Sequence, residues 1–104
     1  MTPLQTLDVF QVHIQLPEIF STRFAALIPQ QYKKINDLLE KRVILNYALD
    51  MARVHLWVTI QAKDQTEVMD ILATFPVIKY VKVEIFELAF SNSAPIGLPE
   101  LIMN

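Results

Sequence analysis

Apolar and polar residues alternate in three stretches of the chain: residues 6–16, 53–62 and 77–90. A period of two is typical of a strand with one buried face, so each stretch predicts a strand. Residues 43–49 are rich in β-branched and aromatic side chains and predict a fourth strand. The apolar positions expected to face the core are Phe10, Val12, Ile14, Leu16, Val54, Leu56, Val58, Ile60, Val81, Val83 and Ile85.

Two further stretches have the spacing of an amphipathic helix. In residues 21–42 apolar side chains recur every three or four positions opposite a charged face. Pro29 removes a backbone donor and clashes with the preceding turn, so it predicts a kink or a restart, and the unbroken apolar stripe favours the kink. The second helix is expected to begin after Asp64, capped by Asp64 and Glu67, and to end before Pro76.

The predicted order β-α-β-β-α-β is that of the ferredoxin-like α+β plan. It implies a four-stranded antiparallel sheet with the first and third strands at the centre and both helices on one face. The other face would then carry Gln11, His13, Gln15, His55, Trp57, Thr59, Lys82, Glu84 and Phe86. This mixture of ionisable and aromatic groups is unusual for a surface in water, so we expect it to close against a second sheet and line a cavity.

Composition strengthens the expectation of an oligomer. The 104 residues are 53% hydrophobic and only 19% charged, whereas about 25% is a typical charged fraction. Because no apolar run approaches the ~20 residues of a membrane span, the excess apolar surface is expected at subunit interfaces. We predict one domain over residues 1–90 and an extension over residues 91–104, which is apolar enough to dock on a neighbouring subunit.

Charge and residue usage exclude several classes of function. A net charge of −2, with the basic residues dispersed, gives no nucleic-acid footprint, and the absence of cysteine excludes disulfides and thiolate chemistry. His13 and His55 do not have a metal-binding spacing, so no metal is expected. The start of the chain lacks the pattern of a signal peptide, which predicts a cytoplasmic protein. The expected partners are a small-molecule ligand and further copies of the chain, and neither nucleic acid nor membrane.

A family resemblance covers most of the chain. Its best part runs from residue 64 to residue 88, and a second part covers the first strand and first helix. The residues that carry it are Asp64, Ile71, Leu72, Phe75, Pro76, Tyr80, Val83, Glu84 and Ile85, with Leu16, Pro17, Ile28, Lys33, Ile35 and Leu39 in the second part. In these positions the chain resembles muconolactone delta-isomerase and, more broadly, the dimeric α+β barrel proteins, in which two ferredoxin-like sheets close face to face.

The chain also departs from that family in two places. After the first helix the isomerases carry a glycine and a segment rich in tryptophan and arginine, whereas residues 43–56 here contain neither. Their first strand has histidine and arginine on its polar face, whereas this chain has Gln11 and His13. The resemblance implies the fold and a cofactor-independent proton shift on a small carboxylate or lactone.

Glu84 is the first candidate for a catalytic residue, and His13 and His55 are the next. A proton shift along an unsaturated lactone needs one base that abstracts a proton and returns it, a role suited to a carboxylate. The histidines would relay protons or donate to a developing enolate oxygen. Alternatively, Glu84 pairs with Lys82 or with a lysine of a neighbouring chain, and the histidines make only structural hydrogen bonds.

Five residues are candidates for ligand binding: Gln11, Trp57, Tyr80, Lys82 and Phe86. Lys82 would bind a carboxylate, and Trp57 and Phe86 would form apolar walls. The alternatives are a solubilising Lys82, interface packing of the two aromatic rings, and a Tyr80 that only anchors the corner between helix and strand. The rival function is a non-catalytic ligand-binding or assembly module, and a cofactor-free oxygenase is a third possibility by fold analogy.

Overall fold

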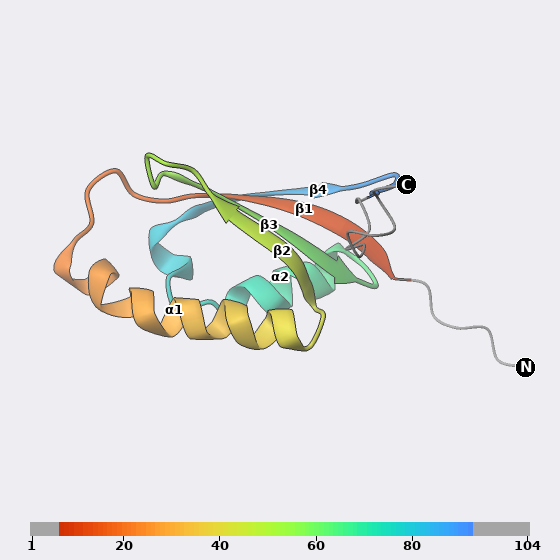
Figure 1. The fold of residues 1–104 in the computed structure, drawn as a ribbon, viewed down its shortest axis with the longest axis horizontal. Helices are drawn as coiled ribbons and strands as arrows, with labels where there is room; N and C mark the ends of the chain where they lie inside the picture. Colours follow the sequence, from red (N-terminus) through yellow and green to blue (C-terminus); the bar gives the residue numbers. More distant parts are fainter. Residues whose placement is uncertain (1–6, 93–104) are drawn as a thin grey trace, which may run out of the picture.

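The computed structural model describes residues 7–92, which form a four-stranded sheet and two helices (Figure 1). The elements are β1 (Asp8–Gln15), α1 (Thr22–Glu40), β2 (Ile44–Leu49), β3 (His55–Ala62), α2 (Gln65–Ala73), the 3-10 turn η1 (Ile78–Tyr80) and β4 (Lys82–Glu87). The sheet is antiparallel throughout, in the order β2-β3-β1-β4, and both helices lie on the same face. This confirms the predicted ferredoxin-like plan. The predicted docking of the extension lies outside the described residues, apart from Ser91 and Asn92.

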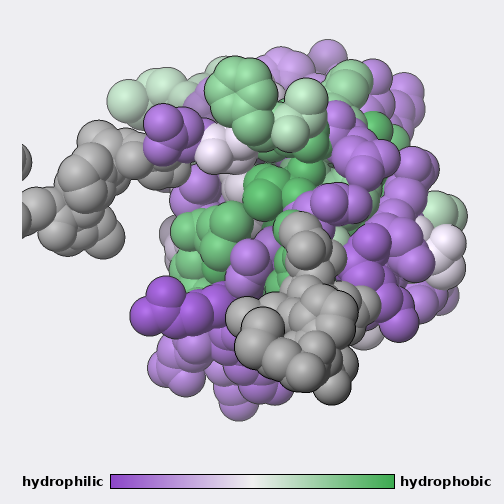
Figure 2. All heavy atoms as spheres, turned by 90° about the vertical axis from the view of Figure 1, so that its right-hand side faces the viewer, coloured by the Kyte–Doolittle hydropathy of each residue, from purple (hydrophilic) through white to green (hydrophobic). Residues whose placement is uncertain are grey.

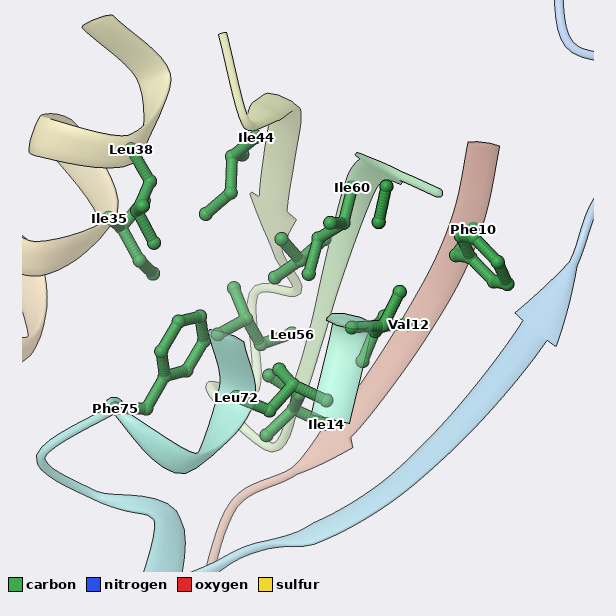
Figure 3. Packing of buried hydrophobic residues seen from close by; sticks show 13 residues of the cluster. Phe10, Val12, Ile14, Ile35, Leu38, Ile44, Leu56, Ile60, Leu72 and Phe75 are labelled. Carbon is green, nitrogen blue, oxygen red and sulfur yellow. The ribbon is translucent and has the colours of Figure 1, made fainter. Parts of the chain in front are cut away.

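The core lies between the sheet and the helices. The apolar alternate residues of β1 and β3 are buried, as Phe10, Val12 and Val58 illustrate with 0% exposure each. Figure 3 shows Ile35 and Leu38 of α1 and Leu72 of α2 pointing towards this layer. Burying one such side chain stabilises the fold by about 1.5–3 kcal/mol, so the period-two pattern determines which side of each strand faces the helices.

Helix α1 is held at both ends by local hydrogen bonds. At its start the Ser21 hydroxyl accepts from the backbone N–H of Phe24 at 3.1 Å. At its end the N–H groups of residues 42 and 43 donate to the carbonyls of residues 39 and 38, both at 3.0 Å. This is the Schellman arrangement, and it places Arg42 in the left-handed region with φ 60°.

Pro29 does not interrupt α1, so the restart considered from the sequence does not occur. Proline cannot donate to the carbonyl four residues earlier, which belongs to Ala25. Both Pro29 and Ala25 lie on the exposed side of the helix, where water can satisfy that carbonyl. The cost of the proline is therefore small enough for the helix to continue through it.

Helix α2 begins as predicted. The Asp64 carboxylate accepts from the Glu67 N–H at 2.8 Å, and the Glu67 carboxylate accepts from the Lys63 N–H at 3.0 Å. The second bond reaches one residue further back than the usual capping box, in which it would go to the capping residue itself. The helix ends at Ala73, before Pro76. No helix in the described part of the chain is long and apolar enough to cross a membrane.

The last strand is shorter than predicted. It was expected over residues 77–90 but begins at Lys82 and ends at Glu87, and residues 78–80 form η1 instead. The reason lies in its neighbour: β1 ends at Gln15, whose partner on β4 is Lys82, so residues 77–81 have no strand to pair with. Their backbone bonds within the turn instead, with the N–H of residue 80 donating to the carbonyl of residue 77 at 2.9 Å.

Strand β2 contains a bulge that the sequence does not reveal. Ile44 pairs with Ile60 and Asn46 pairs with Thr59, so Leu45 is an extra residue on this strand. Because side chains alternate between faces, the extra residue changes the side on which every later residue of β2 lies. Asn46 and Ala48 consequently share the face of Thr59 and Trp57, which the helices do not cover.

Candidate functional site on the open face of the sheet

The face of the sheet that the helices leave uncovered, called the open face below, carries three rows of side chains set by the strand register. The first row contains Phe86, Gln11, Thr59 and Asn46, the second contains Glu84, His13, Trp57 and Ala48, and the third contains Lys82, Gln15 and His55. All predicted site residues except Tyr80 are among them. Figure 2, which views the end of the molecule where β4 finishes, shows apolar side chains reaching the surface beside hydrophilic ones at the upper edge, where the open face lies.

His13 lies at the centre of a chain of three ionisable side chains. Its Nδ1 atom is 3.4 Å from Glu84 Oε1, and its Nε2 atom is 2.9 Å from His55 Nδ1. The His13 side chain is 20% exposed, whereas that of Glu84 is 69% exposed. The open face therefore joins the three predicted catalytic residues in one hydrogen-bonded series, with the carboxylate at its solvent end.

The contact between the two imidazoles constrains their protons. Two ring nitrogens 2.9 Å apart need one proton between them, because two N–H groups would repel and two lone pairs would make no bond. His13 Nδ1–H donates to Glu84 in both of its protonation states. When His13 is neutral, its Nε2 atom accepts from the Nδ1–H of His55; when His13 is cationic, its Nε2–H donates to His55 Nδ1. The contact persists in both states, so one proton can pass between the rings without a large movement of either.

Trp57 lies against both imidazoles. Its ring centroid is 5.6 Å from that of His13 and 5.7 Å from that of His55, and the histidine rings are stacked on each other at 5.0 Å. Contacts with a large ring on one side limit the rotation of a flat side chain. Trp57 therefore restricts the orientation of both imidazoles.

The first row forms a neutral hydrogen-bond network. The Thr59 hydroxyl lies 3.1 Å from Gln11 Oε1 and 3.0 Å from Asn46 Oδ1. The hydroxyl has one hydrogen, so it can donate to the oxygen of only one of these two amides. The other amide must be rotated by 180°, so that its NH₂ group faces the hydroxyl and donates to it. Asn46 was not predicted as a site residue, because only the bulge at Leu45 brings it to the open face.

Asp50 positions the start of β3, a role that the sequence did not indicate. Its Oδ1 atom accepts from the N–H of Val54 at 2.9 Å and from that of His55 at 3.0 Å. The bond from the His55 N–H is the main cause that holds the pKa of Asp50 below its usual range. The tight turn also places Arg53 at φ 61°. An aspartate five residues before the first residue of β3 is the signal for this turn, since its short carboxylate can bond to nearby backbone amides.

The remaining predicted residues lie around this centre. Lys82 does not pair with Glu84: the ion pair found within residues 7–92 joins Glu84 to His13. Tyr80 lies in η1 rather than on the strand, and its ring packs edge-on against Phe24 at 5.9 Å, which makes it an anchor between the turn and α1. Lys82 and Tyr80 nevertheless line one pocket of about 330 Å³ at the end of the open face, together with Gln15.

No group of three or more histidine or acidic side chains that could hold a metal ion occurs among residues 7–92. Comparison of the chain with protein-family models and with curated protein sequences finds no match. The functional argument therefore depends on the geometry of the open face.

Proposed function

We propose that the open face is one wall of a cavity shared by two copies of the chain, and that this cavity binds a small unsaturated carboxylate or lactone. In this proposal the protein shifts a proton on that ligand without a cofactor, as the resemblance to muconolactone isomerases implies. The observation that carries the proposal is the hydrogen-bonded series of Glu84, His13 and His55. A carboxylate and two imidazoles in contact can accept and return protons near neutral pH.

The exposed aromatic residues support the pairing of two open faces. Trp57 is 39% exposed and Phe86 is 50% exposed, both beside the ionisable series. Large aromatic side chains of this kind are typical of interfaces, where one side of the ring is covered. If Trp57 and Phe86 form the walls of the shared cavity, the second sheet would cover the Glu84 carboxylate and exclude bulk water from the series.

Each residue has a distinct role in the proposed reaction. A C–H proton of the ligand passes to the Glu84 carboxylate, the double bond moves, and the same carboxyl group returns the proton to another carbon, so reactant and product are isomers. His13 orients the carboxylate and shares a positive charge with His55, which stabilises the enolate formed in between. Lys82, one row away, would hold the carboxylate of the ligand as a point charge.

The narrow form of the proposal is tested by following the ultraviolet absorbance of muconolactone in the presence of the protein. We expect turnover by the unaltered protein and a kcat lower by about 10²-fold or more for Glu84→Gln, the typical contribution of general acid–base catalysis. Glu87→Gln is the matched control, because Glu87 lies exposed on the same strand and has no bond to His13. Absence of turnover by the unaltered protein, or equal rates for Glu84→Gln and the parent, would reject the proposal.

A non-catalytic binding or assembly module is the second candidate, and one observation favours it. Neither of the two pockets described for residues 7–92 lies over His13. If two open faces pack in direct contact, the aromatic rings fill the interface and no cavity remains. Light scattering would then still report a dimer, but small carboxylates would not change the fluorescence of Trp57, the single tryptophan of the chain.

A further inference from the structure

The outer side of β2 presents unpaired backbone groups. β2 lies at the edge of the sheet, and in the described part of the chain it pairs only with β3 (Figure 1). Just beyond the paired residues, the N–H of Asp50 donates to the carbonyl of His55 at 3.0 Å. Hydrogen-bonded and non-hydrogen-bonded pairs alternate in an antiparallel ladder. Ala48 therefore bonds to β3, whereas the N–H and C=O groups of Tyr47 and Leu49 point away from the sheet.

The side chains along this edge are apolar. The strand Ile44–Leu49 contains no charged residue and no proline. Natural sheets commonly protect an edge with such residues, because an unprotected edge pairs with other strands. Beside the strand, Tyr32 of α1 is 57% exposed, Leu49 is 42% exposed, and Met51 of the following hairpin is 97% exposed. This edge is therefore better suited to contact with another strand than to contact with water.

The opposite edge of the sheet is different. On β4 the N–H of Leu88 bonds to β1, so the same alternation turns the backbone groups of Val83 and Ile85 outward. Glu84 lies between these two residues. If two β4 strands paired about this position, Glu84 would lie opposite Glu84 of a second copy, and like charges directly opposite each other repel. On β2 the equivalent position is held by Ala48, which has no charge.

The free groups of β2 define one register with a second copy. An antiparallel pair centred on Ala48 sets Tyr47 of each copy opposite Leu49 of the other, and each such pair can exchange both N–H···O bonds. A pair centred on Tyr47 would instead bring Leu49 opposite Leu45, where the bulge interrupts the strand. The register centred on Ala48 keeps the bulge outside the paired segment and leaves no free group of Tyr47 or Leu49 unused.

The side chains are compatible with this register. Tyr47 and Leu49 share the helix side of the sheet, so each tyrosine ring would contact a leucine of the other copy directly across the strands. Asp50 would lie opposite Asn46, which is uncharged, so like charges do not meet. Ala48, with the smallest side chain of β2, lies where the two strands cross the axis and allows them to approach closely.

We infer that β2 is a self-association surface, through which two copies of the chain join their sheets edge to edge about a two-fold axis at Ala48. A two-fold interface must be complementary to itself, and the free groups of β2 meet this condition. The open faces of both copies then lie on the same side of one continuous sheet. This surface is separate from the open face, so the inference does not depend on the proposed function.

Amide hydrogen exchange of the unaltered protein, followed by NMR, tests the pairing. We expect the N–H groups of Tyr47 and Leu49 to exchange about 4- to 10-fold more slowly at about 1 mM protein than at about 10 μM, the range for a dimer with a Kd of roughly 100 μM or lower. The N–H of Ala48, which bonds to β3, should exchange slowly at both concentrations. The N–H groups of Val83 and Ile85 are the control for the other edge and should exchange rapidly at both.

Introduced cysteines locate the axis. The chain contains no cysteine, so a single introduced one forms a disulfide only with a second copy. In the inferred pair the Cα atoms of the two Ala48 residues are about 4.5 Å apart, within the range of about 4.4–6.8 Å that a disulfide spans. Ala48→Cys should therefore give a covalent dimer on mild oxidation. Asn46→Cys, exposed on the same strand and face, is the matched control, because its two copies would be roughly 13 Å apart and should not cross-link.

Three results would overturn the inference. The first is exchange of Tyr47 and Leu49 that does not depend on protein concentration. The second is protection of Val83 and Ile85 together with the two β2 residues, because β2 would then pair with β4 of the other copy. The third is equal cross-linking, or none, of folded Ala48→Cys and Asn46→Cys. Exchange in the unaltered protein decides if a variant does not fold, and absence of turnover of muconolactone would change none of these measurements.

Discussion

A double-mutant cycle can measure the two hydrogen bonds of His13 separately. The bond to His55 is short, at 2.9 Å, and partly buried. A hydrogen bond of this kind contributes about 0.5–1.5 kcal/mol to stability, so we expect a coupling energy near 1 kcal/mol between His13→Ala and His55→Ala. The bond to Glu84 is 3.4 Å long, and the Glu84 side chain is 69% exposed. Solvent screening at such a site reduces an ion pair to below about 0.5 kcal/mol.

The coupling energy between His13 and Glu84 changes if two open faces close on each other. Exclusion of water would raise the coupling between His13 and Glu84 into the range of about 1.5–3 kcal/mol found for hydrogen bonds to charged groups. The assay is urea unfolding at pH 7, followed by the fluorescence of Trp57, which contacts both histidines. Each variant is measured at low and at high protein concentration, since only the dimer is sensitive to concentration.

Two results would refute this reasoning. A coupling energy between His13 and His55 that is indistinguishable from zero would mean that the imidazoles do not bond to each other. A coupling energy between His13 and Glu84 that stays below about 0.5 kcal/mol in a protein shown to be dimeric would mean that dimerisation does not cover the open face.

Two further predictions concern the backbone around the site. Arg42→Gly should leave stability unchanged or raise it by up to about 1 kcal/mol, because glycine adopts φ 60° without the clash that arginine has there. Lys41→Gly is the control, since Lys41 precedes Arg42 and has an ordinary φ of −80°. It should lower stability in the same urea assay. Asp50→Asn should flatten the loss of stability in acid. The folded-state pKa of Asp50 lies below the unfolded value of 3.8, so its contribution is present above that pH and is lost as the pH falls through the folded value. Acid titrations of the variant and the parent that superimpose would contradict this role of Asp50.

The fold was predictable because burial and periodicity agree on the two central strands. Every second residue is buried from Phe10 to Ile14 on β1 and from Leu56 to Ala62 on β3, and the pairing of the two strands runs without a shift from Asp8 opposite Ala62 to Gln15 opposite His55. The alternation in the sequence therefore maps directly onto the two faces. It placed His13, His55 and Glu84 on the same side before any contact between them was known.

The features that could not be predicted depend on contacts between distant segments. The bulge at Leu45 exists because Ile44 must reach the core while Asn46 pairs with Thr59. The start of β4 at Lys82 depends on where β1 ends, and the buried amide of Gln31 accepts from the N–H of a residue 46 positions away. Tyr80 illustrates the same limit, since its contact with Phe24 removes it from the face on which a continuous strand would have put it.

The bulge of β2 has a consequence for how this chain can vary. β2 is an edge strand, and edge strands usually tolerate changes in length. Here the residues after Leu45 serve two surfaces, since Asn46 and Ala48 belong to the open face, whereas Tyr47 and Leu49 line a pocket between α1 and the sheet. Because Leu45 is the extra residue of the bulge, deleting it would keep Asn46 opposite Thr59 and Tyr47 opposite Val58. Inserting one residue after Asn46 would instead turn Tyr47 to the open face. Deletion of Leu45 should therefore preserve both surfaces, whereas insertions and deletions after Asn46 should impair both together.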